Sequence, residues 1–137
     1  MKIITGLVKG PFKDEAEFKA AYLKVMRKRF GAIKFFEIES AETEVGIPDI
    51  LAASYGQPAV FTELKHVKKD GLIKFTADQP IWYKKNADLR VQILVWDSRN
   101  NLCLYLDPAD VVKAKTLSMK VPPLDEVVEM EFDTPNV

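Results

Sequence analysis

Three charged residues stand where a metal ion and a water molecule can be used for hydrolysis. Glu63 and Lys65 lie two positions apart in a predicted strand over residues 59–65, so their side chains leave the same face. Asp49 lies in the preceding predicted strand, over residues 47–53, beyond a turn. Carboxylates are the hard oxygen ligands that Mg²⁺ prefers, and a neighbouring lysine can hold a water for attack on a phosphodiester. The spacing therefore predicts phosphate chemistry.

Each of these residues also has an ordinary structural explanation. Pro48 and Asp49 can simply start a strand, because proline is tolerated at a first strand position. Glu63 and Lys65 can form a charge pair that faces solvent. However, the apolar pattern predicts interior strands here, and three charged groups converging there would cost desolvation without a purpose. We therefore favour the metal site.

The same residues resemble a known family. Pro48-Asp49 followed by Glu63-Leu64-Lys65 resembles the PD-(D/E)xK nuclease signature, with 14 positions from Asp49 to Glu63. Residues 45–50 are similar to the G-x-PD segment of its virus-type replication-repair nuclease (VRR-NUC) branch, which is related to archaeal Holliday-junction resolvases. Residues 76–82 are similar to that branch's helix, which opens near a glutamine. The resemblance extends over residues 17–97, most of the chain.

The resemblance implies a restriction-endonuclease-like fold and a Mg²⁺-dependent DNA endonuclease, with Mn²⁺ able to substitute. In that arrangement Asp49 and Glu63 bind the metal, the main-chain carbonyl of Leu64 also reaches it, and Lys65 positions the attacking water. It further implies a branched DNA substrate such as a four-way junction. Small members of the branch resemble phage-encoded resolvases, which act as homodimers in the cytoplasm of the host cell.

Two further candidate site residues have alternative roles. The family often has a glutamate on its first helix that completes the metal site, and Glu17 falls at about that place. Glu17 is also a good capping-box partner for Asp14, and Glu15 is available nearby. We favour Glu17 as a metal ligand. By resemblance Gln79 approaches the active site, and by helix chemistry it is the third-position partner of an N-cap at Thr76; both roles are compatible.

The periodicity of the chain predicts one α/β domain with a mixed central sheet and helices packed on its faces. A strongly apolar segment, residues 90–96, is expected to be central and buried on both sides. Residues 66–74 are predicted to be a loop beside the site. The predicted strands are residues 33–38, 47–53, 59–65, 90–96 and 102–106, and the predicted helices are 14–30, 77–86 and 108–115.

Composition narrows the function classes. The 137 residues suit one domain, and no apolar run approaches the length of a membrane span, so a cytoplasmic protein is the simplest interpretation. A single cysteine, Cys103, excludes an internal disulfide framework, and the lone His66 is interpreted as structural or phosphate-facing. The sequence has no phosphate-binding P-loop, no dinucleotide-binding glycine motif and no H-E-x-x-H helix.

Charge is balanced over the chain but unevenly distributed. The formal net charge is +0, with 20 basic and 20 acidic residues. Five of the acids lie from Asp125 onward, where no lysine or arginine occurs, so the rest carries 20 basic against 15 acidic residues, or +5. We therefore divide the chain into a nuclease domain, 1–124, and an acidic tail, 125–137. The tail is predicted to dock on a partner or to mimic DNA.

The basic clusters at residues 24–34, 65–74 and 84–85 either meet phosphates or form solvated faces. The alternative function is a non-cleaving nucleic-acid-binding or replication accessory protein on a nuclease fold. The intact Asp49, Glu63 and Lys65 argue against that alternative, because a retired site has no reason to keep all three.

Overall fold

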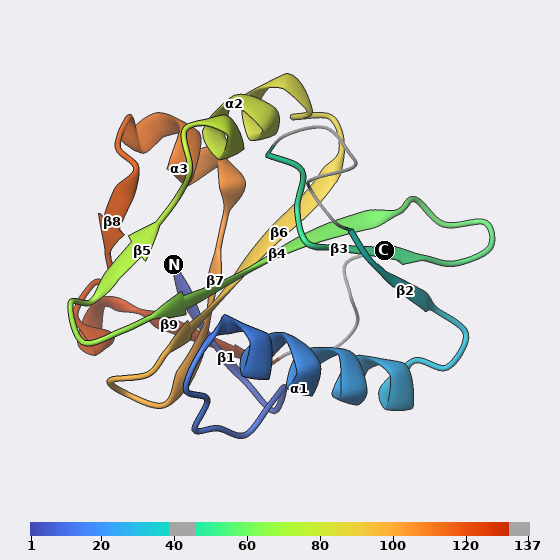
Figure 1. Cartoon of the computed structure of the whole chain (residues 1–137), viewed down its shortest axis with the longest axis horizontal. Coiled ribbons are helices and arrows are strands. Elements are labelled where there is room, and N and C mark those ends of the chain that lie inside the picture. Colours follow the sequence, from blue (N-terminus) through green and yellow to red (C-terminus); the bar gives the residue numbers. More distant parts are fainter. Residues whose placement is uncertain (39–45, 132–137) are drawn as a thin grey trace.

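The computed structural model describes residues 1–38 and 46–131, which form one seven-stranded mixed sheet with helices on both faces (Figure 1). The helices are α1 (Glu15–Arg29), α2 (Asp78–Lys85), α3 (Pro108–Ala114) and a 3₁₀ turn, η1 (Leu124–Glu126). The strands are β1 (Lys2–Thr5), β2 (Lys34–Glu37), β3 (Ile50–Ala53), β4 (Val60–Val67), β5 (Leu72–Lys74), β6 (Arg90–Asp97), β7 (Leu102–Leu106), β8 (Ser118–Lys120) and β9 (Val128–Glu131).

The main sheet has the order β2-β3-β4-β6-β7-β1-β9. Neighbouring strands are antiparallel except for β4 beside β6 and β1 beside β9, which are parallel. The five predicted strands occupy β2, β3, β4, β6 and β7, in adjacent positions. The predicted α/β class with a mixed central sheet flanked by helices is therefore confirmed.

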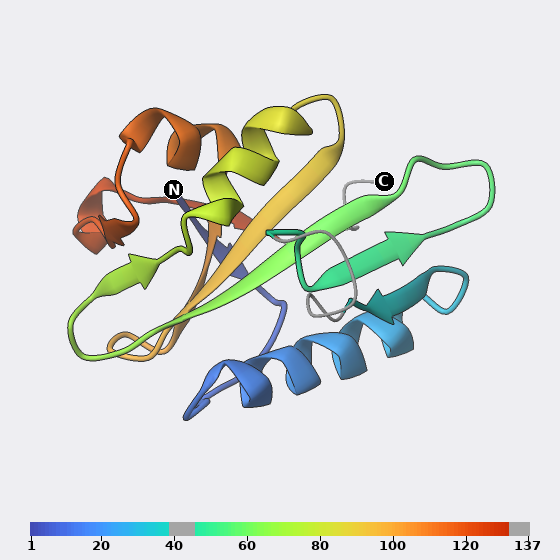
Figure 2. The same ribbon diagram turned by 45° about the horizontal axis from the view of Figure 1, so that its top comes forward.

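The sheet separates two hydrophobic clusters, which makes the fold three layers thick. On one face, α1 packs its buried residues, among them Phe18, Tyr22 and Met26, against Leu64 and Leu94. On the other face, α2 and α3 cover Ile93, Val95 and Leu106. Figures 1 and 2 show α1 on one side of the sheet and α2 with α3 on the other. Strand β6 lies between both layers and is buried along most of its length, as its largely apolar sequence predicts.

The N-terminal helix forms where capping chemistry predicts it. The Asp14 side chain accepts a hydrogen bond of 2.9 Å from the Glu17 amide, and the helix runs to Arg29 with basic residues in its last turn. The predicted helix at residues 108–115 also forms, with Asp107 capping the Ala109 amide at 2.9 Å. Both helices follow from local sequence alone.

Two predictions about local structure were wrong. Residues 66–74 are not a loop, because β4 continues to Val67 and β5 pairs with β8 in a separate two-stranded sheet. The N-cap of α2 is Ala77, without a side-chain cap hydrogen bond, in place of the predicted Thr76. The second half of the predicted capping box is nevertheless present, since Gln79 Oε1 accepts from the Thr76 amide at 3.0 Å.

The segment after Pro123 contributes to the main sheet. Strand β9 (Val128–Glu131) pairs in parallel with β1 at the edge of the main sheet, while residues 132–137 of the acidic tail lie outside the described residues. The acidic tail assigned from residue 125 therefore includes a strand of the sheet. No helix among the described residues has both the length and the apolar character needed to span a bilayer.

Candidate functional site

The candidate site lies where strands β3 and β4 separate. Their pairing ends with Ile50 opposite Thr62, so β4 continues past that point without β3 beside it. Asp49 stands at this separation, and its Oδ2 accepts a hydrogen bond of 3.1 Å from the Leu64 amide. The carboxylate thus takes the place of a strand partner for Leu64. This arrangement brings Asp49 next to Glu63.

A glycine sets the approach to Asp49. Gly46 has a φ of +88°, a conformation that residues with a side chain rarely adopt. A Cβ on Gly46 would also lie 2.5 Å from the main-chain oxygen of Asp78, at the start of α2. Glycine is therefore required to bring the segment that carries Asp49, just before β3, against the helix that carries Gln79.

Glu63 is a buried carboxyl group with an incomplete set of partners. Its side chain is 5% exposed, and Oε1 accepts a hydrogen bond of 3.0 Å from Gln79 Nε2. Oε2 is buried and has no hydrogen-bond donor within the described residues. The Asp49 carboxyl group is close enough to hydrogen-bond with Glu63 when one of the two holds a proton. Two ionised carboxylates repel each other and have no hydrogen to share, so a proton or a cation between them is needed to stabilise the pair.

The electrostatics of Glu63 agree with this geometry. Burial, and then the adjacent Asp49 carboxylate, raise the pKa of Glu63 to about 9, while the Lys65 ammonium acts in the opposite direction. In the metal-free protein, burial and the neighbouring carboxylate therefore favour the protonated form of Glu63. A bound cation would favour the ionised form and displace that proton.

The Lys65 ammonium group lies close to three neighbouring side chains. Its Nζ donates a hydrogen bond of 2.8 Å to Gln79 Oε1, lies 3.8 Å from Glu63 Oε1, and sits 4.8 Å from the centre of the Phe75 ring. The side chain is 13% exposed, so the ammonium is partly desolvated and fixed in position. An ammonium has three donors, which leaves capacity for a water or a phosphate oxygen.

Gln79 connects the residues that the sequence singled out. Its amide nitrogen donates to Glu63, and its oxygen accepts from both Lys65 and the Thr76 amide. Both roles considered for Gln79, contact with the site and closure of the helix start, are thus present at once. Tyr83 lies one helical turn further on, with a buried hydroxyl group that has no partner among the described residues. Burial, then Glu63 and Asp49, raise the pKa of Tyr83.

Glu17, predicted as a metal ligand, is engaged at the helix start. Its Oε1 accepts a hydrogen bond of 2.8 Å from the Lys13 amide, and its own amide donates to Asp14. Glu15 is the glutamate of α1 that lies toward the site: partial desolvation and then the Asp49 carboxylate raise its pKa, while Lys65 lowers it. Glu15 itself is exposed on the surface of α1 and shares a hollow with Lys65. The spacing of the sequence does not distinguish these two glutamates.

The residues present fit a hard divalent cation. Among the residues that the structure describes, no three acidic, histidine or cysteine side chains form a ready-made metal cage. Mg²⁺ does not need one, because it keeps several waters and binds through one or two carboxylates together with substrate phosphates. Asp49 and Glu63 supply two such carboxylates, and Oε2 of Glu63, which is buried and has no hydrogen-bond partner among the described residues, is available as a metal ligand.

No protein-family model and no curated protein matches the sequence. The structure is similar to that of Hjc, a Holliday junction resolvase from the archaeal hyperthermophile Archaeoglobus fulgidus, with 15% sequence identity and a TM-score of 0.44. The match covers 71% of this chain and 97% of the resolvase chain. At this distance the similarity identifies neither the residues that act nor the activity.

Proposed function

We propose that this chain is a divalent-metal-dependent endonuclease of the PD-(D/E)xK type that hydrolyses phosphodiester bonds in DNA. The observation that carries the proposal is the buried Glu63, with one unpartnered carboxylate oxygen, next to the half-buried Asp49 and beside a lysine held in place by Gln79. A cluster of charged groups with little solvent around it lowers the free energy of unfolding unless it binds a ligand that offsets the lost hydration. A cation is the occupant that would resolve it.

In this mechanism Asp49, Glu63 and the main-chain carbonyl of Leu64 hold the cation. When bound, Mg²⁺ or Mn²⁺ neutralises charge that develops on the phosphate and makes water more acidic. Lys65 holds the attacking water through its remaining N–H groups, while its bond to Gln79 fixes the ammonium. Gln79 in turn orients the Glu63 carboxyl group.

We further propose Glu15, in place of Glu17, as the carboxylate that α1 contributes to this site, because Glu17 is engaged in the helix cap. Glu15→Gln should then raise the Mg²⁺ concentration needed for half-maximal cleavage. Glu17→Gln should leave that concentration unchanged and change the free energy of unfolding by no more than about 0.5 kcal/mol, because glutamine keeps an oxygen that can accept from the Lys13 amide. The reverse pattern would restore Glu17 as the ligand.

The proposed substrate is branched DNA, such as a four-way junction, cut by a homodimer that presents two sites to two strands. The test is cleavage of labelled junction, flap, duplex and single-stranded DNA with Mg²⁺, Mn²⁺ or EDTA. We expect metal-dependent cutting of at least one shape by the wild-type chain and none by Asp49→Ala. Tight binding without cutting would instead support the non-cleaving binding module.

A further inference from the structure

Two adjoining hollows lead away from Lys65 along the surface. The first, about 250 Å³, is lined by Glu15, Lys65 and residues of the β4–β5 turn. The second, about 480 Å³, is lined by Lys13, Ser98 and the same turn. His66, Lys68 and Asp70 line both hollows, so the two form one continuous path from the site toward the residues just before α1.

Lysines dominate this path. Lys74 is paired with Asp70 at 3.0 Å, and Lys13 lies 4.0 Å from Glu17. Lys68 and Lys69 are exposed, and no carboxylate among the described residues pairs with either of them. These two ammonium groups are therefore available to an external anion.

The turn that presents Lys68 and Lys69 is tightly built. The Gly71 amide donates to the Lys68 carbonyl at 3.1 Å, and the Leu72 amide donates to Asp70 Oδ1 at 3.1 Å. Gly71 has a φ of +71°, and a Cβ there would collide with the Arg99 guanidinium group. The two hydrogen bonds restrain the backbone of the turn, so little ordering of the main chain is required when its lysines bind a ligand.

We infer that Lys68 and Lys69 bind backbone phosphates of the DNA strand that enters the site, at positions next to the phosphate held beside Lys65. This inference rests on the proposed function and identifies the path of its substrate. The supporting observations are the continuity of the two hollows with Lys65, the unpaired charge of the two lysines and the restrained turn. Exposed lysines on a restrained turn recognise phosphates by charge and read no base, so binding along this path is independent of DNA sequence.

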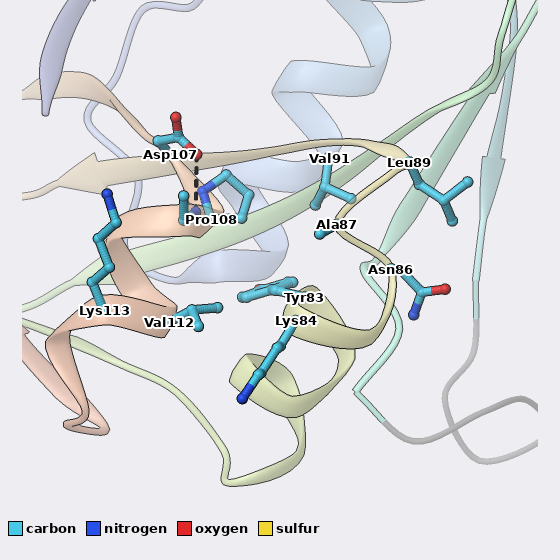
Figure 3. A pocket seen from close by; sticks show the side chains of 11 residues that line it. Tyr83, Lys84, Asn86, Ala87, Leu89, Val91, Asp107, Pro108, Val112 and Lys113 are labelled. Carbon is cyan, nitrogen blue, oxygen red and sulfur yellow. Dashed lines mark hydrogen bonds between the residues drawn. The ribbon is translucent and has the colours of Figure 1, made fainter.

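A second lysine pair provides a matched control. A cavity of about 300 Å³ between α2 and α3 is bordered by Lys84 and Lys113, with apolar side chains such as Leu89 and Val91 in its wall (Figure 3). Of the described residues that line it, none is a site carboxylate or Lys65. Lys84 and Lys113 are exposed, like Lys68 and Lys69, so removing them makes the same change in net charge away from the site.

The experiment measures binding without cleavage. Fluorescence anisotropy of a labelled four-way junction and a labelled duplex is recorded in EDTA, with Asp49→Ala as the parent chain, from about 50 to 200 mM salt. We expect Lys68→Ala/Lys69→Ala to weaken binding more than tenfold and to reduce the slope of log K against log[salt] by about 1.8, which is about 0.9 for each phosphate that the chain no longer neutralises. Lys84→Ala/Lys113→Ala should leave the slope unchanged.

Lys68→Arg/Lys69→Arg should leave the slope of log K against log[salt] unchanged, because both positive charges remain. An equal loss from both lysine pairs, no loss from Lys68→Ala/Lys69→Ala, or absence of DNA binding would overturn the inference. Cleavage by the wild-type chain on the same DNAs separates the two proposals. If the DNAs are cut equally well with and without Lys68 and Lys69, only the proposed phosphate contacts are contradicted. If DNA binding depends on the two lysines but no DNA is cut, only the proposed nuclease activity is contradicted.

Discussion

Replacing Glu63 by glutamine should make the metal-free protein more stable at neutral pH. Glutamine has nearly the same shape, keeps an oxygen that can accept the hydrogen bond from Gln79, and presents an amide that can donate to Asp49. It also removes the ionisable group that burial disfavours. Glu63 is thus expected to destabilise the folded chain. Replacing it should raise the free energy of unfolding, whereas most substitutions of buried residues lower it.

The magnitude follows from the proton that the folded chain must hold. Glu63 has an ordinary pKa of 4.5, so it is ionised in the unfolded chain at pH 7, whereas folding raises its pKa to about 9. Folding at pH 7 must therefore take up a proton. The free-energy cost is about 1.4 kcal/mol for each pH unit above 4.5, which amounts to about 3 kcal/mol at pH 7. The wild-type contribution is complete below pH 4.5 and is lost as the pH rises toward 9.

Urea unfolding in EDTA at pH 4.5 and at pH 7 measures this difference. Glu63→Gln and wild type should be nearly equally stable at pH 4.5, and the variant should gain about 3 kcal/mol at pH 7. Adding Mg²⁺ at pH 7 should stabilise wild type more than the variant, because the cation binds only the folded ionised site. A variant that is less stable at pH 7 by the same amount as at pH 4.5 would refute the reasoning. It would mean that Glu63 is ionised and paired with Lys65.

Two substitutions test how the site is held, and the reactivity of a buried thiol tests the packing of the core. Gln79→Ala removes the side chain that joins the site's lysine and glutamate, so we expect cleavage to fall and urea unfolding to show a loss of about 1–3 kcal/mol. Gly46→Ala should cost about 1–3 kcal/mol, because its φ is +88° and its Cβ would press on the start of α2; the thermal midpoint measures this. Burial raises the pKa of Cys103 to about 12, so its thiol should react with alkylating agents at pH 8 only after unfolding.

The core of the fold was predictable because its signals are local. The antiparallel meander of β2, β3 and β4 follows from strand-forming segments in consecutive order along the chain, and α1 follows from Asp14 and a regular apolar stripe. The burial of β6 follows from its lack of any polar face. In these elements, propensity, capping and pattern all indicate the same structure.

The strands that the sequence did not predict are stabilised by distant partners. Strands β5 and β8 have three residues each and pair across more than forty intervening residues, so neither carries a recognisable pattern. Strand β1 has four residues and is fixed between β7 and β9, both near the other end of the chain. Short strands gain their stability from such pairings and packing, which periodicity cannot report.

The site shows the same division between local and distant causes. Glu63 and Lys65 share a strand, so their common face follows from the period of two, and their spacing alone predicts that they meet. The glutamate of α1 does not follow in this way, because Glu15 and Glu17 are two residues apart at a helix start and differ by about 200° around its axis. Which one faces the site depends on where Asp14 begins the helix and on the angle at which α1 crosses the sheet. Local capping engages Glu17, whereas the packing of α1 on the sheet brings Glu15 to the hollow that Lys65 lines, and only this second step depends on tertiary structure.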